Sequence, residues 1–451
     1  MLGIIALIVA VFLYGLKKYR YISIFLYISF MLGTGGGLGL WTDWILGAKN
    51  KDLALVYTFC INAYLISQHK FRLPSKDWWV KCYKVLLLFL VGCAFFSYFY
   101  YKFTPFQIVQ GGRDFLLIFS VFILIRISKP DLQRVLEILF WITIVTSILY
   151  VLQIVVGRPL MPYNNDYAID TTTGLVRLYN RPPMARFFLL ASFVCPRFFP
   201  GKINLYRILF FAAIICSLGR TYIISTILGI LLVVVMMGRG TKIVKTFVVL
   251  GLLSLPFVGL ISERFEKSNT IEDVQNGMEG GYADFNSGDG TMSYRMAWVY
   301  ERGEYLIHRP IGEQIFGLGL ISGSQDIVYK MYHFRLGLRN EEGEVDQLST
   351  PDSSYGNLLT KLGFLGGVIY LVFIVSLSVL FFQYRKNVPI LTICSVELII
   401  MFITAFSGSG MSYPSNFVIY FLALSLLYPI GNERILRNRD SKWLLIPIKQ
   451  E

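Results

Sequence analysis

The sequence predicts an all-α polytopic membrane protein with about 12 to 13 transmembrane helices and one large, mainly helical outer loop. Its 451 residues are 55% hydrophobic and only 16% charged. The apolar residues form long runs rather than amphipathic stripes, and a bilayer core of roughly 30 Å needs about 20 helical residues. Of the polar stretches, residues 262–355 are long enough to hold a separate folded unit.

The apolar runs define thirteen candidate helices, several of them short. Each is bounded by a polar connector or by glycine and proline residues. The candidates are 2–16, 21–40, 52–67, 82–101, 114–127, 132–156, 183–199, 204–218, 221–237, 246–261, 356–384, 389–411 and 417–430.

Alternate connectors are basic, and this predicts the orientation. Lys and Arg in short connectors mark the cytoplasmic side, so the remaining connectors and the loop 262–355 face outward and the C-terminus is cytoplasmic. The first apolar run has no basic residue before it and no small-residue cleavage site after it, which favours a retained helix over a signal peptide. The basic connectors are 17–20, 69–81, 126–134, 202–207, 238–245, 385–386 and 432–442.

The chain therefore divides into membrane helices with short loops (1–261), the large outer loop (262–355), and C-terminal membrane helices with a basic tail (356–451). The loop contains sixteen acidic and eight basic residues, while the whole chain carries +14, so the remainder carries +22. This basic charge is spread over inner connectors and helix ends rather than gathered on one face. Nucleic acid is therefore not expected as a partner, and membrane lipids are.

Cysteine and motif patterns give no sign of a cofactor. All six cysteines lie in or beside apolar segments and none lies in the outer loop, so packing rather than disulfides must hold that loop. No His and Cys spacing resembles a zinc site, and no P-loop, dinucleotide fingerprint or nucleophile elbow is present. We expect no metal and no cofactor.

Arginines at the predicted outer boundary are the most informative polar residues. An unbroken helix over 204–237 would be about 51 Å long, so the chain must turn near Gly219 and Arg220. Arg177, Arg181 and Arg186 enter another helix from the same side, against the usual bias. An arginine that merely extends to the interface would explain one of them, but a phosphate or pyrophosphate ligand would explain the whole set.

Two carboxylates stand at unusual places in the sequence. Asp352, in STPDSSYGNLL, immediately precedes an apolar helix, where it is either a helix cap or a functional group. Glu397 lies inside an apolar span, where a carboxylate must face a cavity or pair with a cation. An arginine of the outer set is a conceivable partner, and a structural pair and an acceptor-side contact are the alternatives.

The outer loop contains MSYRMAWVYERGEYLIHRPIGEQIFGLGL, with a Ser-x-Arg, a tryptophan, a His-x-Pro and a Gly-x-Gly. In these motifs it resembles the O-antigen ligase and O-antigen polymerase superfamily. SLGRT is similar to the family's Ser-x-Ser-Arg motif with Gly219 in place of the second serine, and DSSY to its His-Asn-x-Tyr motif. The similarity covers roughly residues 170–385. Its loop positions are Ser293, Arg295, Trp298, His308, Pro310, Gly317 and Gly319, followed by Asp352, Tyr355, Gly363 and Gly366.

The resemblance implies a GT-C-like glycosyltransferase of the bacterial inner membrane, with the large loop in the periplasm. Its donor would be a glycan carried on undecaprenyl pyrophosphate. Its acceptor would be a hydroxyl of a lipid-linked repeat unit in a polymerase, or of lipid A core in a ligase. A chain-length regulator protein is a further partner that this function would involve.

The resemblance also implies roles for single residues. Arg220 and Arg295 would face the pyrophosphate, and Asp352 would be the general base, which is a chemistry that Asp and Glu commonly perform on glycosyl donors. Asp352 stands where ligases have a histidine, and this departure favours a polymerase. The expected substrate-binding residues are Arg177, Arg181, Arg186, Ser293, Trp298 and Tyr355.

A transporter of lipid-linked sugars is the alternative from another class. Arginine-lined cavities and glycine-broken helices also suit the transport of anionic lipids. The sequence contains no repeat between its halves, and a large folded loop on one face favours chemistry there.

Overall fold

Among the residues that it describes, the computed structural model is helical apart from two short pairs of strands. The structure describes residues 2–32, 44–45, 48–73, 77–158, 160, 167–169, 176–178, 181–182, 184–238, 292–322, 325–336, 345, 347–348, 353–408 and 410–428.

The described residues of the N-terminal half form helices and two antiparallel strand pairs. Strands β1 (Trp44–Ile45) and β2 (Ala48–Lys49) form one pair; β3 (Tyr167–Ile169) and β4 (Val176–Leu178) form the other, in which Ala168 faces Arg177. The helices are α1 (Leu2–Gly15), η1 (Lys17–Tyr19), α2 (Arg20–Leu32), α3 (Asn50–Ser67), α4 (Trp78–Phe99), α5 (Pro105–Leu116), η3 (Leu117–Ser120), α6 (Val121–Leu124), α7 (Lys129–Val156), α8 (Ala185–Val194), η4 (Pro196–Phe198), α9 (Ile203–Cys216) and α10 (Arg220–Met236).

The outer loop and the C-terminal part are helical as well. The predicted helix 246–261 and the first part of the outer loop, to residue 291, lie outside the described residues. The helices are α14 (Met292–Ile307), α15 (Ile311–Phe316), α16 (Asp326–Met331), α17 (Ser354–Tyr384), α18 (Ile390–Ile403), η7 (Thr404–Phe406), η8 (Gly410–Ser412), η9 (Pro414–Phe417) and α19 (Val418–Leu427).

Four helical segments in the described part of the chain are long and apolar enough to cross a membrane. They are 78–99, 105–124, 129–156 and 354–384, and the protein is therefore a multi-pass membrane protein. Most of the other predicted spans correspond to apolar helices of 10–17 residues, fewer than the roughly 20 that a straight crossing needs.

Local sequence signals explain where the long helices begin and end. Thr104 caps α5 by accepting from the Gln107 amide at 3.3 Å, and Ser128 caps α7 in the same way. Each cap is followed by a proline in the first turn, where the missing amide proton costs nothing. Gly157, in the left-handed region at φ 73°, ends α7.

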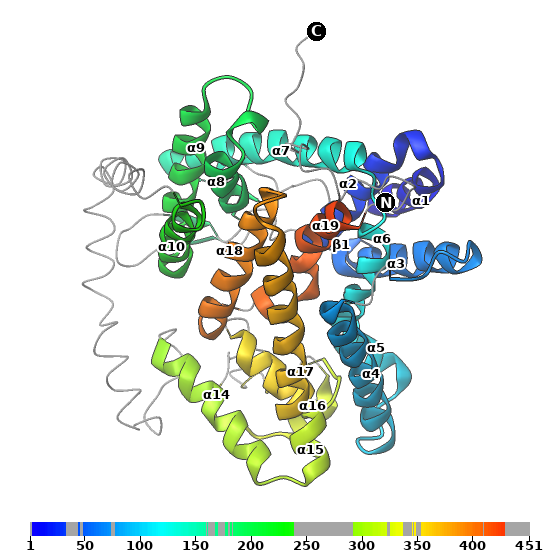
Figure 1. Cartoon of the computed structure of the whole chain (residues 1–451). Coiled ribbons are helices and arrows are strands. Elements are labelled where there is room, and N and C mark those ends of the chain that lie inside the picture. The colour runs from blue at the N-terminus through cyan, green and yellow to red at the C-terminus, as the bar shows by residue number, and fades with distance from the viewer. Residues whose placement is uncertain are drawn as a thin grey trace.

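The helices are arranged along α17, which joins two ends of the molecule (Figure 1). Helices α14, α15 and α16 gather around its N-terminal end, and α7, α8 and α9 lie at the opposite end. A break at Gly363 (φ 69°) interrupts α17 where it meets Gly317, and a Cβ at either glycine would lie 2.6 Å from the other's backbone nitrogen. The outer helices are thus fitted against the first turns of α17 by backbone contact.

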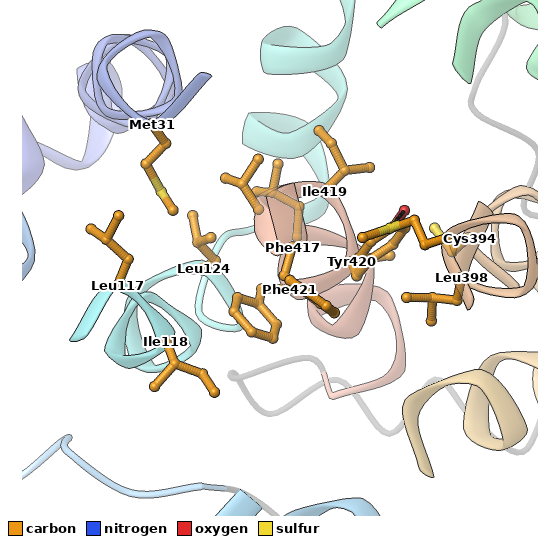
Figure 2. Close-up of a cluster of buried hydrophobic side chains, with 14 of the residues drawn as sticks. Met31, Leu117, Ile118, Leu124, Cys394, Leu398, Phe417, Ile419, Tyr420 and Phe421 are labelled. Carbon is orange, nitrogen blue, oxygen red and sulfur yellow. Dashed lines mark hydrogen bonds between the residues drawn. The ribbon is translucent and has the colours of Figure 1, made fainter. Parts of the chain in front are cut away.

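Helix α19 fills the centre of the apolar core (Figure 2). Phe421 in its first turn and Phe417, the residue just before it, lie toward Leu117 and Ile118 of η3, while Tyr420 lies toward α18. The helix is buried on nearly every side. It therefore joins α18 to the N-terminal helices and holds α18 in place for the contacts described next.

Candidate functional site

The turn between α9 and α10 lies where the sequence predicted a break. Helix α9 ends at Cys216 and α10 begins at Arg220. Leu218 has φ 49°, a left-handed conformation that is uncommon for a leucine, and the Ser217 hydroxyl accepts from the Gly219 amide at 3.4 Å. The two helices are therefore joined by a sharp three-residue turn that ends at Arg220.

Gly219 makes room for Arg181. A Cβ at Gly219 would lie 2.7 Å from Nη2 of Arg181 and 3.2 Å from its Cζ. The φ of Gly219 is −86°, which any residue can adopt. The glycine is therefore needed here for the space that its missing side chain leaves, and not for an unusual backbone conformation. The guanidinium of Arg181 consequently lies beside Gly219, the residue that precedes Arg220 at the start of α10.

Two arginines contact the ring of Tyr222. The Cζ of Arg181 lies 4.8 Å and that of Arg186 lies 5.3 Å from the ring centroid. These distances are within the range of cation–π attraction. Tyr222 stands in the first turn of α10, so it connects the start of α10 to the first turn of α8 and to Arg181 just before it.

Arg186 pairs with Glu397 of α18. Nε of Arg186 donates to Oε1 at 2.9 Å and Nη2 donates to Oε2 at 2.5 Å, while Nη1 donates to the hydroxyl of Ser225 at 3.0 Å. The side chains of Arg186 and Glu397 are 18% and 7% exposed. Of the alternatives that the sequence left open for Glu397, the structure has the ion pair with an arginine of the outer set.

Helix α14 lies against the first turns of α17. A Cβ at Gly356 would lie 2.3 Å from the Trp298 ring, and one at Gly303 would lie 3.6 Å from Leu359. Residue numbers rise in the same direction along both helices, which are therefore parallel over this contact. Arg295, one turn before Trp298, lies at the level where α17 begins.

The start of α17 is fixed by hydroxyl groups. Ser353 is the N-cap, and its hydroxyl accepts from the Gly356 amide at 3.2 Å. Ser354 donates to the Gly408 carbonyl at 2.7 Å, and the Tyr355 hydroxyl donates to the Phe402 carbonyl at 2.9 Å. The last two bonds join α17 to the end of α18 and to the segment that follows it.

A buried arginine folds the outer segment onto α14. Arg302 is fully buried, donates to the Leu336 carbonyl and, at 3.4 Å, to that of Gln347, and pairs with Glu301 at 2.5 Å. Gln347 lies five residues before Asp352, so this contact anchors the chain that leads to α17. The sequence analysis missed Arg302, although its position four residues after Trp298 was a signal that both face one side.

A second ion pair supports the neighbouring helix α15. Arg309 donates to Glu313 at 2.9 Å, and the hydroxyl of Tyr100 donates to the same carboxylate at 2.9 Å. Hydrogen bonding to Glu313 raises the pKa of Arg309 above its ordinary value. Arg309 is therefore charged at any working pH, and it helps to attach α15 to the end of α4.

The predicted site residues fall into two groups and a remainder. Arg181 and Arg186 meet at the start of α10, which begins with Arg220. Arg295, Trp298 and Tyr355 lie where α14 meets α17. Asp352 lies outside the described residues, as do the side chains of Ser293, in α14, and Arg177, in β4.

Helix α18 links the two groups. It carries Glu397, which binds Arg186, and it leads directly into η7, which both α14 and α17 contact. Tyr222 and Ser225 were not foreseen from the sequence. They are three residues apart, about one turn of helix, and this spacing was the available signal that both lie on one face, but it could not reveal which arginines would reach them.

Within the described ranges, no three His, Cys, Asp or Glu side chains are placed to hold a metal ion together. The arrangement instead offers guanidinium groups and hydroxyls, which are suited to an anionic ligand. No protein-family model matches the chain, and no curated protein matches it.

Proposed function

We propose that the protein is a surface-polysaccharide polymerase of the bacterial inner membrane. It would transfer a glycan from undecaprenyl pyrophosphate to a hydroxyl of a lipid-linked repeat unit, within a GT-C-like fold of about 12 to 13 transmembrane helices. The observation that carries the proposal is the place of Arg181, beside Gly219 and the start of α10. Two arginine-bearing segments, far apart in the sequence, converge there as a pyrophosphate site would require.

Arginines suit the leaving group of this reaction. As the bond from the anomeric carbon to the pyrophosphate oxygen breaks, that oxygen keeps the electron pair and negative charge develops on the lipid pyrophosphate. Guanidinium groups fixed near it stabilise this charge more in the transition state than in the ground state. We assign Arg220 and Arg295 to this role, with Arg177 and Arg181 as further binding residues.

Asp352 is the proposed base. As the acceptor oxygen forms its bond to the anomeric carbon, the hydroxyl becomes acidic and a carboxylate can take its proton. The competing interpretation of Asp352 was a helix cap. Because Ser353 caps α17, capping does not require Asp352.

Two alternatives remain to be separated by experiment. Purified protein given only lipid-linked repeat units should make a ladder of polymers if it is a polymerase, whereas a ligase would need lipid A core. In cells, Asp352→Asn should abolish chain extension while the lipid-linked substrate still reaches the outer face. Accumulation of that substrate on the inner face would instead identify a transporter.

The arginine assignments have their own test. Arg220→Ala and Arg295→Ala should each lower the turnover of polymer formation by about a hundredfold to a thousandfold, as the loss of a preorganised donor to a developing charge does. The thermal midpoint of the purified variants should stay close to that of the wild type. Normal turnover in both variants would remove pyrophosphate stabilisation from the mechanism.

A further inference from the structure

Two arginines contact one ring, but their other contacts differ. The edge of Arg186 formed by Nε and Nη2 is the fork that would hold a phosphate in a bidentate fashion, and the carboxylate of Glu397 occupies it. Its third nitrogen binds Ser225. Arg186 is thus bound to side chains on α18 and α10.

Arg181 is placed differently. Its guanidinium extends past Tyr222 to the turn before α10, where Gly219 leaves space for it. Glu397 pairs with Arg186 rather than with Arg181. Of the two, Arg181 therefore approaches the turn that ends at Arg220.

We propose that Arg186, held by Glu397, is a positioning residue that fixes Tyr222 and Ser225 and so aligns Arg181 with the start of α10. A diphosphate on a lipid chain would then contact Arg181 and not Arg186. The proposal rests on the proposed function for its choice of ligand. It changes the role that the sequence analysis gave to Arg186.

The physical argument concerns what the ion pair contributes. Replacing a buried ion pair by apolar side chains of similar volume often leaves stability unchanged, whereas removing one partner leaves an uncompensated charge. A positioning pair should therefore tolerate joint replacement, while a ligand-binding arginine should not. This difference separates the two roles in an experiment.

The variants are Arg186→Met, Arg186→Met with Glu397→Leu, Arg181→Met, and Arg181→Met with Glu397→Leu, each in nanodiscs. The probe is farnesyl pyrophosphate, whose affinity is measured with farnesyl monophosphate as the reference ligand. Polymer formation from lipid-linked repeat units is measured in parallel. A matched control is Asp114→Asn, which breaks the pair that Lys51 makes with Asp114 at 2.9 Å on other helices.

We expect Arg186→Met alone to lower the thermal midpoint and the affinity, and the added Glu397→Leu to restore both. Arg181→Met should weaken farnesyl pyrophosphate binding by about tenfold to a hundredfold, the worth of a charged hydrogen bond, and Glu397→Leu should not restore it. Asp114→Asn should lower the thermal midpoint while leaving the affinity for farnesyl pyrophosphate unchanged. The proposal is overturned if the double variant of Arg186 folds like the wild type yet binds as poorly as Arg181→Met.

A second double variant keeps the test decisive if the apolar double variant of Arg186 and Glu397 does not fold. Arg186→Gln with Glu397→Gln retains hydrogen bonding without charge, and the same outcomes apply to it. If the wild type binds farnesyl pyrophosphate but makes no polymer, the proposed function fails while the binding data still judge Arg186. If the wild type makes polymer and a folded double variant of Arg186 and Glu397 does not bind farnesyl pyrophosphate, the proposed function stands and the inference fails.

Discussion

Two regions of the molecule place arginine against an aromatic ring, and the arginine is more completely buried in one than in the other. In the outer segment, the Cζ of Arg302 lies 3.9 Å from the Trp298 ring and 4.3 Å from the Phe334 ring, and the side chain is fully buried. At the start of α10, Arg181 and Arg186 share the ring of Tyr222, and the side chain of Arg186 is 18% exposed.

The partners of these arginines explain the difference. Arg302 donates to backbone carbonyls of the same outer segment, which no substitution can remove, so it ties that segment to its own helix. Arg186 binds the side chains of Ser225 and Glu397, which belong to two other helices. An arginine with carbonyl partners stabilises a fold, whereas one with side-chain partners sets the relative position of helices.

The largest effect should come from Arg302→Met. It leaves the Leu336 and Gln347 carbonyls and the Glu301 carboxylate without their buried donor, which costs about 3–5 kcal/mol when one partner of a buried pair is removed. The outer segment should unfold locally. Limited proteolysis should then cut between residues 332 and 348, and the thermal midpoint should fall.

Lys330→Met is the matched control, because Lys330 is exposed on the neighbouring helix α16. It should change neither protease sensitivity nor the thermal midpoint. If Arg302→Met proved as resistant to protease as this control, Arg302 would not be the group that holds the outer segment, and the contrast between the two regions would disappear.

A smaller effect is expected from Gly219→Ala. The new Cβ would displace the guanidinium of Arg181, whose end is flexible, so the fold should survive. Polymer formation should fall by about tenfold, equivalent to about 1.4 kcal/mol. The decisive measurement is a double-mutant cycle with Arg181→Ala.

In that cycle, Gly219→Ala should have no further effect once Arg181 is gone, because its effect acts through that side chain. Leu218→Ala offers a comparison in the same turn, since it alters the turn without entering the space of Arg181. Additive losses from Gly219→Ala and Arg181→Ala would mean that Gly219 serves the backbone of the turn instead.

Parts of this site could be read from the sequence because they depend on local physics. The break at Gly219 and Arg220 followed from helix length against bilayer thickness, and the structure confirms it. That Glu397 must face a cavity or pair with a cation followed from the cost of a carboxylate among apolar residues, and an outer arginine was one of the partners considered. Both arguments need only a short stretch of chain.

Other parts depend on contacts between distant segments. Nothing in the local sequence indicated that Arg186 rather than Arg181 would reach Glu397, 211 positions away, or that Arg302 would bind the Gln347 carbonyl. Two helix lengths also departed from expectation, because α8 and α19 have 10 residues each and are shorter than the apolar runs 183–199 and 417–430. Apolar runs indicate where a helix lies, but turns, caps and 3₁₀ segments decide how much of each run is helical.

The smallest effect separates capping from chemistry at the start of α17. Ser353→Ala removes the hydroxyl that accepts from the Gly356 amide, and it should lower stability by about 1 kcal/mol while polymer formation persists. Asp352→Asn should do the reverse and leave the thermal midpoint unchanged while transfer is lost. Measuring both quantities on both variants tests the assignment. A lowered midpoint with intact transfer in Asp352→Asn would make Asp352 a second cap, and the base would have to be sought elsewhere.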